Sequence, residues 1–347
     1  MLKVYRHYLA ALGMVLSCFI STLSQAKSLD SKVVVELLIS IDYEGDKIRT
    51  TDLEAIRQFQ KQYPTIKLIH FMNAAYFTKS WSKDRDEISK RLLSLIRPGD
   101  DLGVHIHGWK NFVEASGVTF KSHPRYLGNH LPERFHGERG SDVPLDEYST
   151  REITQMLEFS ILELRKRGFP QPTSFRAGGW QSGPKVWSAL KRVGILIDSS
   201  AVPARLIRNL YPRSLLQKKA DSLWSTITEF TKSRQRAGII EVPNNMGLAD
   251  YVSAEHFREM ARNSLKRSIR NGDNKVLFHY GFHQETARLY LDEVSKVIDW
   301  LTSLEKEGKI TLLNHSVIEH IKSAGLYKAY EELVADNANR CRRSVRK

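Results

Sequence analysis

Two carboxylates and two histidines stand at the ends of two apolar runs in this sequence. Asp42 and Glu44 close one run, and His105 and His107 close another. Residues two apart in a strand point to the same face, so each pair would turn both side chains toward one site. Imidazole nitrogens and carboxylate oxygens bind zinc and similar ions, and a carboxylate can also take a proton. The two pairs therefore predict a metal site with a base beside it.

Both pairs also have a structural interpretation, which the residues alone leave open. The carboxylates would then be solvated at a strand end, and the histidines would be hydrogen bonded in the mouth of a barrel. The His-x-His spacing occurs in several classes of metalloenzyme. The metallo-β-lactamase pattern needs a following x-Asp-His, which residues 108–110 do not supply.

Two further clusters hold an arginine and two histidines. Arg176 precedes two glycines and Trp180, so it could orient a carboxylate through forked hydrogen bonds while the indole stacks on a sugar. Alternatively, Arg176 forms a structural salt bridge and Trp180 lies in the core. His279, near the end of another apolar run, could donate a proton to a leaving group, and His283 follows it four residues later. Either histidine could also be structural.

The elements that carry these clusters alternate along the chain. Short apolar, β-branched runs alternate with longer segments of helical periodicity, which predicts an α/β fold with mainly parallel strands. Polar clusters at the carboxyl ends of such strands meet at one edge of the fold, where functional groups gather. The predicted strands are residues 33–41, 67–73, 101–107, 174–176, 195–198, 239–242, 276–280 and 310–313.

The connecting segments are predicted to be helical, with two long exceptions. Ser149 to Glu152 reads as a capping box that begins a helix. Residues 110–147 and 202–237 lack periodicity and are predicted to be irregular, the first as a lid or binding loop. The predicted helices are residues 51–62, 87–96, 153–167, 185–193, 256–269 and 292–304.

The two ends of the chain are set apart from the predicted domain at residues 30–325. Lys3 and Arg6 precede an apolar segment that ends near Ser24-Gln25-Ala26, which predicts that residues 1–26 are a secretory signal. An uncleaved membrane anchor is the alternative. The protein is thus expected to be exported, to a periplasm or the extracellular space, with no stable membrane span once the signal is cleaved. Residues 326–347 are predicted to be a basic tail.

Composition and charge restrict the partners. The chain has 347 residues, of which 41% are hydrophobic, and its two cysteines fall in the signal and in the tail, so no internal disulfide is expected. The formal charge of +14 falls to +12 when Lys3 and Arg6 leave with the signal, which fits an acidic partner or a solvated basic surface. No zinc-finger spacing, RNP motif or P-loop is present, so a nucleic-acid partner is not expected.

The order of these motifs resembles the polysaccharide deacetylases, also called the NodB-like family, over roughly residues 33–320. Residues 42–44 resemble an Asp-x-Glu variant of the family's first motif, and residues 103–109 a Gly-x-His-x-His-x-Trp variant of the second. The common form instead has adjacent aspartates and histidines four apart, and the fourth position after His105 is Trp109. Residues 174–178, 197–200 and 241–243 resemble later motifs, and His279 the histidine of the last one.

The resemblance implies a distorted (β/α)7 barrel, a divalent metal that is usually zinc, and removal of acetyl groups from an N-acetylated sugar of a polysaccharide or oligosaccharide. It implies that Asp42, aligned by Arg176, takes the proton of the attacking water and that His279 protonates the departing amine. The metal ligands are then expected to be Glu44, His105 and His107. The residues expected to contact the substrate are Trp109, Trp180, Asp198 and His283.

Two other functions stay open at this point. A metal-independent glycoside hydrolase would use Asp42 and Glu44 as acid and base, although such pairs need about 5 Å or more across the scissile bond. A non-catalytic saccharide-binding or export protein would keep the barrel and bind glycan without turnover.

Overall fold

One curled, mostly parallel sheet forms the centre of the fold. The computed structural model describes residues 32–82, 84–126 and 138–345, so the predicted signal lies outside the described residues. The strand order is β6-β7-β5-β4-β3-β2-β1-β8, and β9 also pairs with β1. The strands are β1 (Val33–Asp42), β2 (Leu68–Met72), β3 (Asp101–Ile106), β4 (Ser174–Ala177), β5 (Ile197–Asp198), β6 (Arg234–Arg236), β7 (Ile239–Glu241), β8 (Lys275–His283) and β9 (Ile310–Asn314).

Strand β1 is the central strand of this sheet. It pairs in parallel with β8 along most of its length, with β9 near its beginning and with β2 near its end. Nearly all its residues are buried, which accounts for its sequence of almost unbroken apolar residues, because a parallel strand is covered on both faces. Its carboxyl end, where Asp42 stands, is therefore fixed by two neighbouring strands.

An irregular segment that follows β7 is hydrogen bonded to β8. The backbone N–H of Met246 donates to the carbonyl of His279 at 3.1 Å, and that of Ala249 donates to the carbonyl of Gly281 at 2.7 Å. Gly281 returns a hydrogen bond to Gly247 at 3.1 Å. This segment takes the place of a regular strand, which gives the predicted α/β fold with a distorted barrel.

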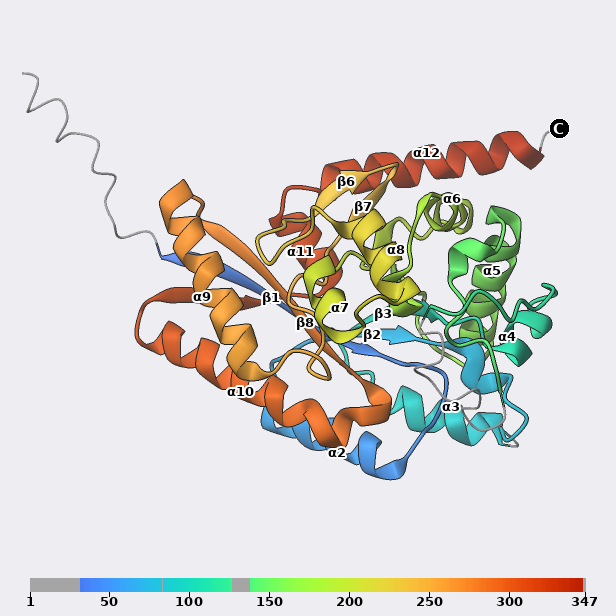
Figure 1. Cartoon of the computed structure of the whole chain (residues 1–347), viewed down its shortest axis with the longest axis horizontal. Helices are drawn as coiled ribbons and strands as arrows, with labels where there is room; N and C mark the ends of the chain where they lie inside the picture. Colours follow the sequence, from blue (N-terminus) through green and yellow to red (C-terminus); the bar gives the residue numbers. More distant parts are fainter. Residues whose placement is uncertain (1–31, 83, 127–137, 346–347) are drawn as a thin grey trace, which may run out of the picture.

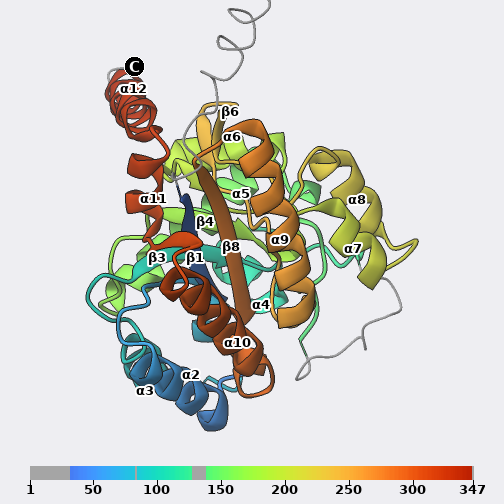
Figure 2. The ribbon, with the colours of Figure 1, turned by 90° about the vertical axis from the view of Figure 1, so that its left-hand side faces the viewer.

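Helices surround the sheet, as Figures 1 and 2 show. Helices α2 and α10 pack against each other beside β1 and β8, and α10 buries a stripe of apolar side chains from Leu291 to Leu301. The predicted capping box at Ser149 and Glu152 is present at the start of α5. The longer helices are α2 (Thr50–Gln62), α3 (Arg85–Leu93), α5 (Thr150–Lys166), α6 (Pro184–Val193), α9 (Ala254–Asn271) and α10 (Ala287–Lys306).

The prediction that residues 202–237 are irregular is wrong in part. They contain α7 (Ala204–Leu210), α8 (Leu215–Trp224) and strand β6, which pairs antiparallel with β7. Ser214 caps α8, whose buried residues Leu216, Ala220 and Trp224 repeat every four positions. The other loop is also partly helical, since α4 covers Lys110–Ala115 and a 3-10 turn covers Leu145–Glu147.

The C-terminal part of the described chain is helical. It comprises α11 (Val317–Ser323) and α12 (Tyr327–Val345), which runs along the edge of the molecule in Figure 1. Leu333 of α12 is buried in one core cluster with Ile197 of β5 and Ile240 of β7. The segment predicted as a basic tail therefore begins as part of the packed fold. No helix among the described residues is long and apolar enough to span a membrane.

Candidate metal centre and active-site pocket

A pocket of about 380 Å³ lies at the carboxyl ends of the strands. Among the residues predicted for the site, three do not line it: Arg176, Asp198 and His279. The predicted residues that line it are Asp42, Glu44, His105, His107, Trp109, Trp180 and His283. Sequence reasoning missed other lining residues with polar side chains, which are Asp46, Tyr126, Ser141, Tyr211, Asp250, Tyr251, Glu285, Thr286 and Tyr290.

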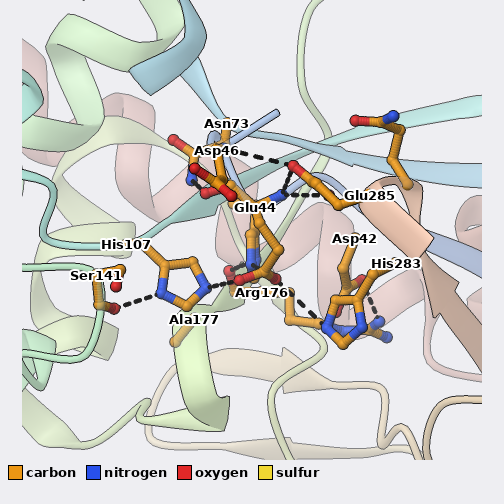
Figure 3. Close-up of polar contacts among 12 residues, drawn as sticks. Asp42, Glu44, Asp46, Asn73, His107, Ser141, Arg176, Ala177, His283 and Glu285 are labelled. Carbon is orange, nitrogen blue, oxygen red and sulfur yellow. Dashed lines mark hydrogen bonds and ion pairs between the residues drawn. The ribbon is translucent and has the colours of Figure 1, made fainter. Parts of the chain in front are cut away.

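Glu44, His105 and His107 converge in this pocket. One ligand atom from each lies within 4.8 Å of the others. The Nε2 atom of His105 is 3.3 Å from Glu44 Oε1, and that of His107 is 2.8 Å from Glu44 Oε2. Figure 3 shows the Glu44 carboxylate turned toward His107. Two strand ends, those of β1 and β3, thus bring the three predicted ligands together.

Backbone carbonyls fix the tautomer of both histidines. The Nδ1 atom of His105 lies 2.8 Å from the carbonyl oxygen of Arg176, and that of His107 lies 2.6 Å from the carbonyl oxygen of Ser141. A carbonyl only accepts a hydrogen bond, so both Nδ1 atoms carry the proton. Nε2 is then the ring nitrogen left to bind a cation, and in both rings it faces Glu44, which is the arrangement of metal-binding histidines.

The charge of Glu44 suits it to bind a cation. Burial alone would raise the pKa of its carboxyl, but His107 and His105 outweigh burial and hold that pKa well below its usual range. The Nε2 atom of His107 is buried and faces Glu44 Oε2 at 2.8 Å. A carboxylate and two Nε2 atoms face one another, so a divalent cation fits the donor set.

Asp42 lines the same pocket and is held by Arg176. The Nη1 atom of Arg176 donates to Asp42 Oδ1 at 2.6 Å and to the Ser40 hydroxyl at 2.8 Å. Its Nε atom donates to the carbonyl of Ser199 at 2.9 Å, and the guanidinium lies over the ring of Phe71. Arg176 is fully buried, so it orients Asp42 and is not available to substrate.

The two histidines of β8 occupy different levels of the barrel. His279 pairs in register with Leu38 and is fully buried, with Arg176 Nη2 3.0 Å from its Nε2 atom. Burial and the charge of Arg176 hold its pKa well below the usual range. His283 pairs in register with Asp42 and lines the pocket, 3.4 Å from Glu44 Oε1. The histidine at the level of Asp42 is therefore His283, not His279.

Asp250 is the partner of His283, and sequence reasoning missed it. Its Oδ1 atom is 3.1 Å from His283 Nδ1, and its Oδ2 atom accepts from the backbone N–H of His283. Burial would lower the pKa of His283, but Asp250 and then Glu44 outweigh burial and raise it to about 10. Asp250 lies just after the irregular segment that is hydrogen bonded to β8, where neither periodicity nor a motif marks a functional residue.

The other predicted substrate contacts have mixed positions. Asp198 is fully buried and accepts hydrogen bonds from the hydroxyl of Ser182 and the indole of Trp187. These contacts anchor β5, and Asp198 does not line the pocket. Trp109 lines the pocket, but its indole N–H donates to the carbonyl of Glu44 at 2.8 Å. Trp180 also lines it, beside the ring of Tyr251.

Comparisons with known proteins give similarity of structure only. No family model matches the chain, and no curated protein matches it. Among solved structures, Puue allantoinase has a TM-score of 0.48 at 10% identity, covering 84% of this chain and 90% of that one.

Two further solved structures are carbohydrate esterases or deacetylases. A family 4 acetyl xylan esterase from Clostridium thermocellum in complex with a cobalt ion has a TM-score of 0.40 at 10% identity, covering 84% and 92%. A chitin deacetylase from Colletotrichum lindemuthianum has a TM-score of 0.38 at 13% identity, covering 82% and 86%. At these TM-scores and identities, the similarities concern structure and do not extend to the activity of this chain.

Proposed function

We propose that this protein is a metal-dependent hydrolase that removes acetyl groups from an N-acetylated sugar. The observation that carries the proposal is the set of possible metal donors. The Nδ1 atoms of His105 and His107 are hydrogen bonded to backbone carbonyls, and their Nε2 atoms face the Glu44 carboxylate. A divalent ion bound there, zinc being the common choice for such donors, would act as a Lewis acid on the acetyl carbonyl.

Asp42 takes the proton of the attacking water in this proposal. Its side chain lines the pocket, and Arg176 holds one of its oxygens at 2.6 Å. This hydrogen bond from a fully buried guanidinium fixes the carboxylate in one orientation, with its second oxygen left to accept the proton. The water oxygen then forms a bond to the acetyl carbon.

His283 supplies the proton that the reaction needs next. The amide C–N bond breaks, acetate forms, and the departing nitrogen takes a proton from the imidazolium of His283. Asp250 favours that imidazolium at neutral pH, because it is the largest of the contributions that raise the pKa of His283 to about 10 against the effect of burial. This role was predicted for His279, which is fully buried against Arg176 and does not line the pocket.

The pocket wall fits a sugar ring. Trp180, Tyr211, Tyr251 and Tyr290 line the pocket together with Leu216 and Leu248. Aromatic faces pack against the apolar face of a sugar, while tyrosine hydroxyls can bond to its hydroxyl groups. The volume of about 380 Å³ is at the small end for ligand sites, so we propose that one sugar unit of a polysaccharide or oligosaccharide enters the pocket.

The glycosidase alternative is less well supported. Its general acid must hold a proton at neutral pH, which requires a carboxyl with a raised pKa. The pKa of Glu44 is instead held well below its usual range by His107 and His105, against the effect of burial. Glu44 is thus suited to bind a cation and unsuited to donate a proton.

The location of the protein is part of the proposal. Residues 1–26 combine a positive start, an apolar segment and a small-x-small end, so we propose export with cleavage of this segment. The substrate would then be a polysaccharide of the cell envelope or its surroundings.

The proposal is tested by acetate release from N-acetylated oligosaccharides. We expect release by the wild-type protein, loss of release on chelation and recovery when zinc is returned. Asp42→Asn should lower the rate by about 100-fold or more, because it removes the base. Wild-type protein that is loaded with metal and releases no acetate from a panel of such substrates would contradict the proposal and favour a saccharide-binding protein.

A further inference from the structure

The loop that carries Glu44 is held from both sides by side chains of other strand ends. Glu44 lies beyond the last residue of β1, so no sheet partner fixes it. Its carbonyl oxygen accepts from the indole of Trp109 at 2.8 Å and from the side-chain amide of Asn73 at 3.0 Å. Its backbone N–H donates to both carboxylate oxygens of Glu285, at 3.1 and 3.3 Å.

We propose that Glu285 is a positioning residue that sets the metal affinity of the site by fixing the backbone of Glu44. The inference deepens the proposed function, since it rests on Glu44 as a metal ligand. Glu285 does not belong to the expected ligand set. It acts through the loop that carries Glu44, and no role in bond breaking is assigned to it.

The carboxylate of Glu285 serves several donors of this loop at once. It accepts from the backbone N–H of Glu44 and, at 3.4 Å, from that of Asp46, and the hydroxyl of Tyr76 also donates to it. Its own backbone carbonyl accepts from Arg49 at 3.0 Å, just after the loop. Glu285 is 8% exposed, so the donors that it satisfies are largely shielded from water.

The position of Glu285 in the chain links this clamp to the proposed proton donor. Glu285 lies in the 3-10 turn Gln284–Thr286, which directly follows His283 at the end of β8. Figure 3 shows Glu285 beside Glu44 and Asp46, on the opposite side of the Glu44 carboxylate from His107. The 3-10 turn therefore lies next to both the expected metal ligand Glu44 and the proposed proton donor His283.

Removal of this support should weaken metal binding rather than abolish it. Groups that hold a metal ligand in place typically contribute 10- to 100-fold to metal affinity. We expect Glu285→Ala to raise the Kd for zinc by about 10- to 100-fold. Glu285→Gln keeps one acceptor oxygen for the N–H of Glu44 at nearly the same volume, so its Kd should rise by less than about tenfold.

A matched control is Glu241→Gln. Glu241 is another buried carboxyl, 1% exposed, on β7 outside the pocket. Zinc Kd values are measured by competition with a chelator for the wild type, Glu285→Ala, Glu285→Gln and Glu241→Gln. The melting temperature of each metal-free protein and its rise at saturating zinc are measured beside them, because a binding defect reduces the rise and a purely structural defect lowers both temperatures equally.

The expected result is a weaker zinc affinity in Glu285→Ala, partial recovery in Glu285→Gln and an unchanged affinity in Glu241→Gln. A Kd for Glu285→Ala equal to that of the wild type overturns this inference and leaves the proposed function standing. Loss of affinity in Glu241→Gln to the same extent also overturns it, because the effect would then be general. A wild-type protein that binds no divalent metal overturns the inference and the proposed function together.

Discussion

Replacement of Glu36 by glutamine tests how the barrel holds its central strand. Glu36 lies on β1 six residues before Asp42 and is 3% exposed. Its Oε2 atom is 2.8 Å from Nδ1 of His320, and its Oε1 atom is 3.5 Å from Nζ of Lys275. The hydroxyl of Ser323 also donates to Oε1. The charged group at this end of β1 thus has three partners.

The magnitude follows from the pKa of Glu36. Burial would raise this pKa, but hydrogen bonds from His320 and Ser323 and the charges of His320 and Lys275 outweigh burial and lower it to about 2 from 4.5. The difference corresponds to ~3 kcal/mol of stability. Because the folded state has the lower pKa, this stabilisation is complete above the unfolded value of 4.5 and is lost as the pH falls toward 2.

Urea unfolding measures the effect. At neutral pH we expect Glu36→Gln to lower the free energy of unfolding by about 3 kcal/mol, and the difference from the wild type to shrink from about pH 5 downward. Glu319→Gln is the control, since its ion pair with Lys67 is partly exposed and should contribute less than about 1 kcal/mol. A Glu36→Gln deficit that is no larger than the control, or that does not change with pH, would refute the reasoning.

Two further predictions concern the proposed reaction. Asp250→Asn should lower the pKa of His283 from about 10 toward its ordinary value, so the loss of activity at alkaline pH should move to lower pH. NMR titration of the His283 imidazole measures this pKa directly, and a pKa that does not change in Asp250→Asn contradicts the pairing of Asp250 with His283. Arg176→Lys keeps a charge but loses the several hydrogen bonds by which the guanidinium spans Asp42, Ser40 and Ser199, so kcat should fall by about 100-fold with little change in KM. Steady-state kinetics on an N-acetylated oligosaccharide checks this, and an unchanged kcat contradicts it.

The fold and the convergence of Glu44, His105 and His107 could be predicted because both depend on patterns that are local in the sequence. Alternating apolar runs and helical segments place strand ends at one edge of the fold, and a two-residue spacing turns two side chains to one face. Asp42 and Glu44 lie at and just beyond the end of β1, and His105 and His107 at and just beyond the end of β3, so the two pairs meet across the intervening β2.

His279 was predicted as the proton donor, and the proposal moves this role to His283, because the predicted strand ended too early. Residues 276–280 were predicted, whereas the strand runs from Lys275 to His283. His279 and His283 share a face, but they are about 13 Å apart along the strand. Only the register with β1, which sets His283 beside Asp42, distinguishes them. Register depends on tertiary pairing and is not visible in one strand's sequence.

Asp250 and Glu285 could not be predicted for a different reason. Asp250 follows an irregular segment that acts as a strand only through its hydrogen bonds to β8. Glu285 lies in a 3-10 turn and acts through the backbone of Glu44, more than two hundred positions earlier in the chain. A sequence pattern reports which side chains share a face, but it does not report which distant backbone group a side chain will reach.

Metal content tests the central claim most directly. Elemental analysis of the purified protein should find about one divalent ion per chain, and His105→Ala and His107→Ala should each lose it while keeping the fold by circular dichroism. Wild-type protein that contains no metal and takes up none on reconstitution would contradict the account, because no cation would then join the Glu44 carboxylate to the two histidines.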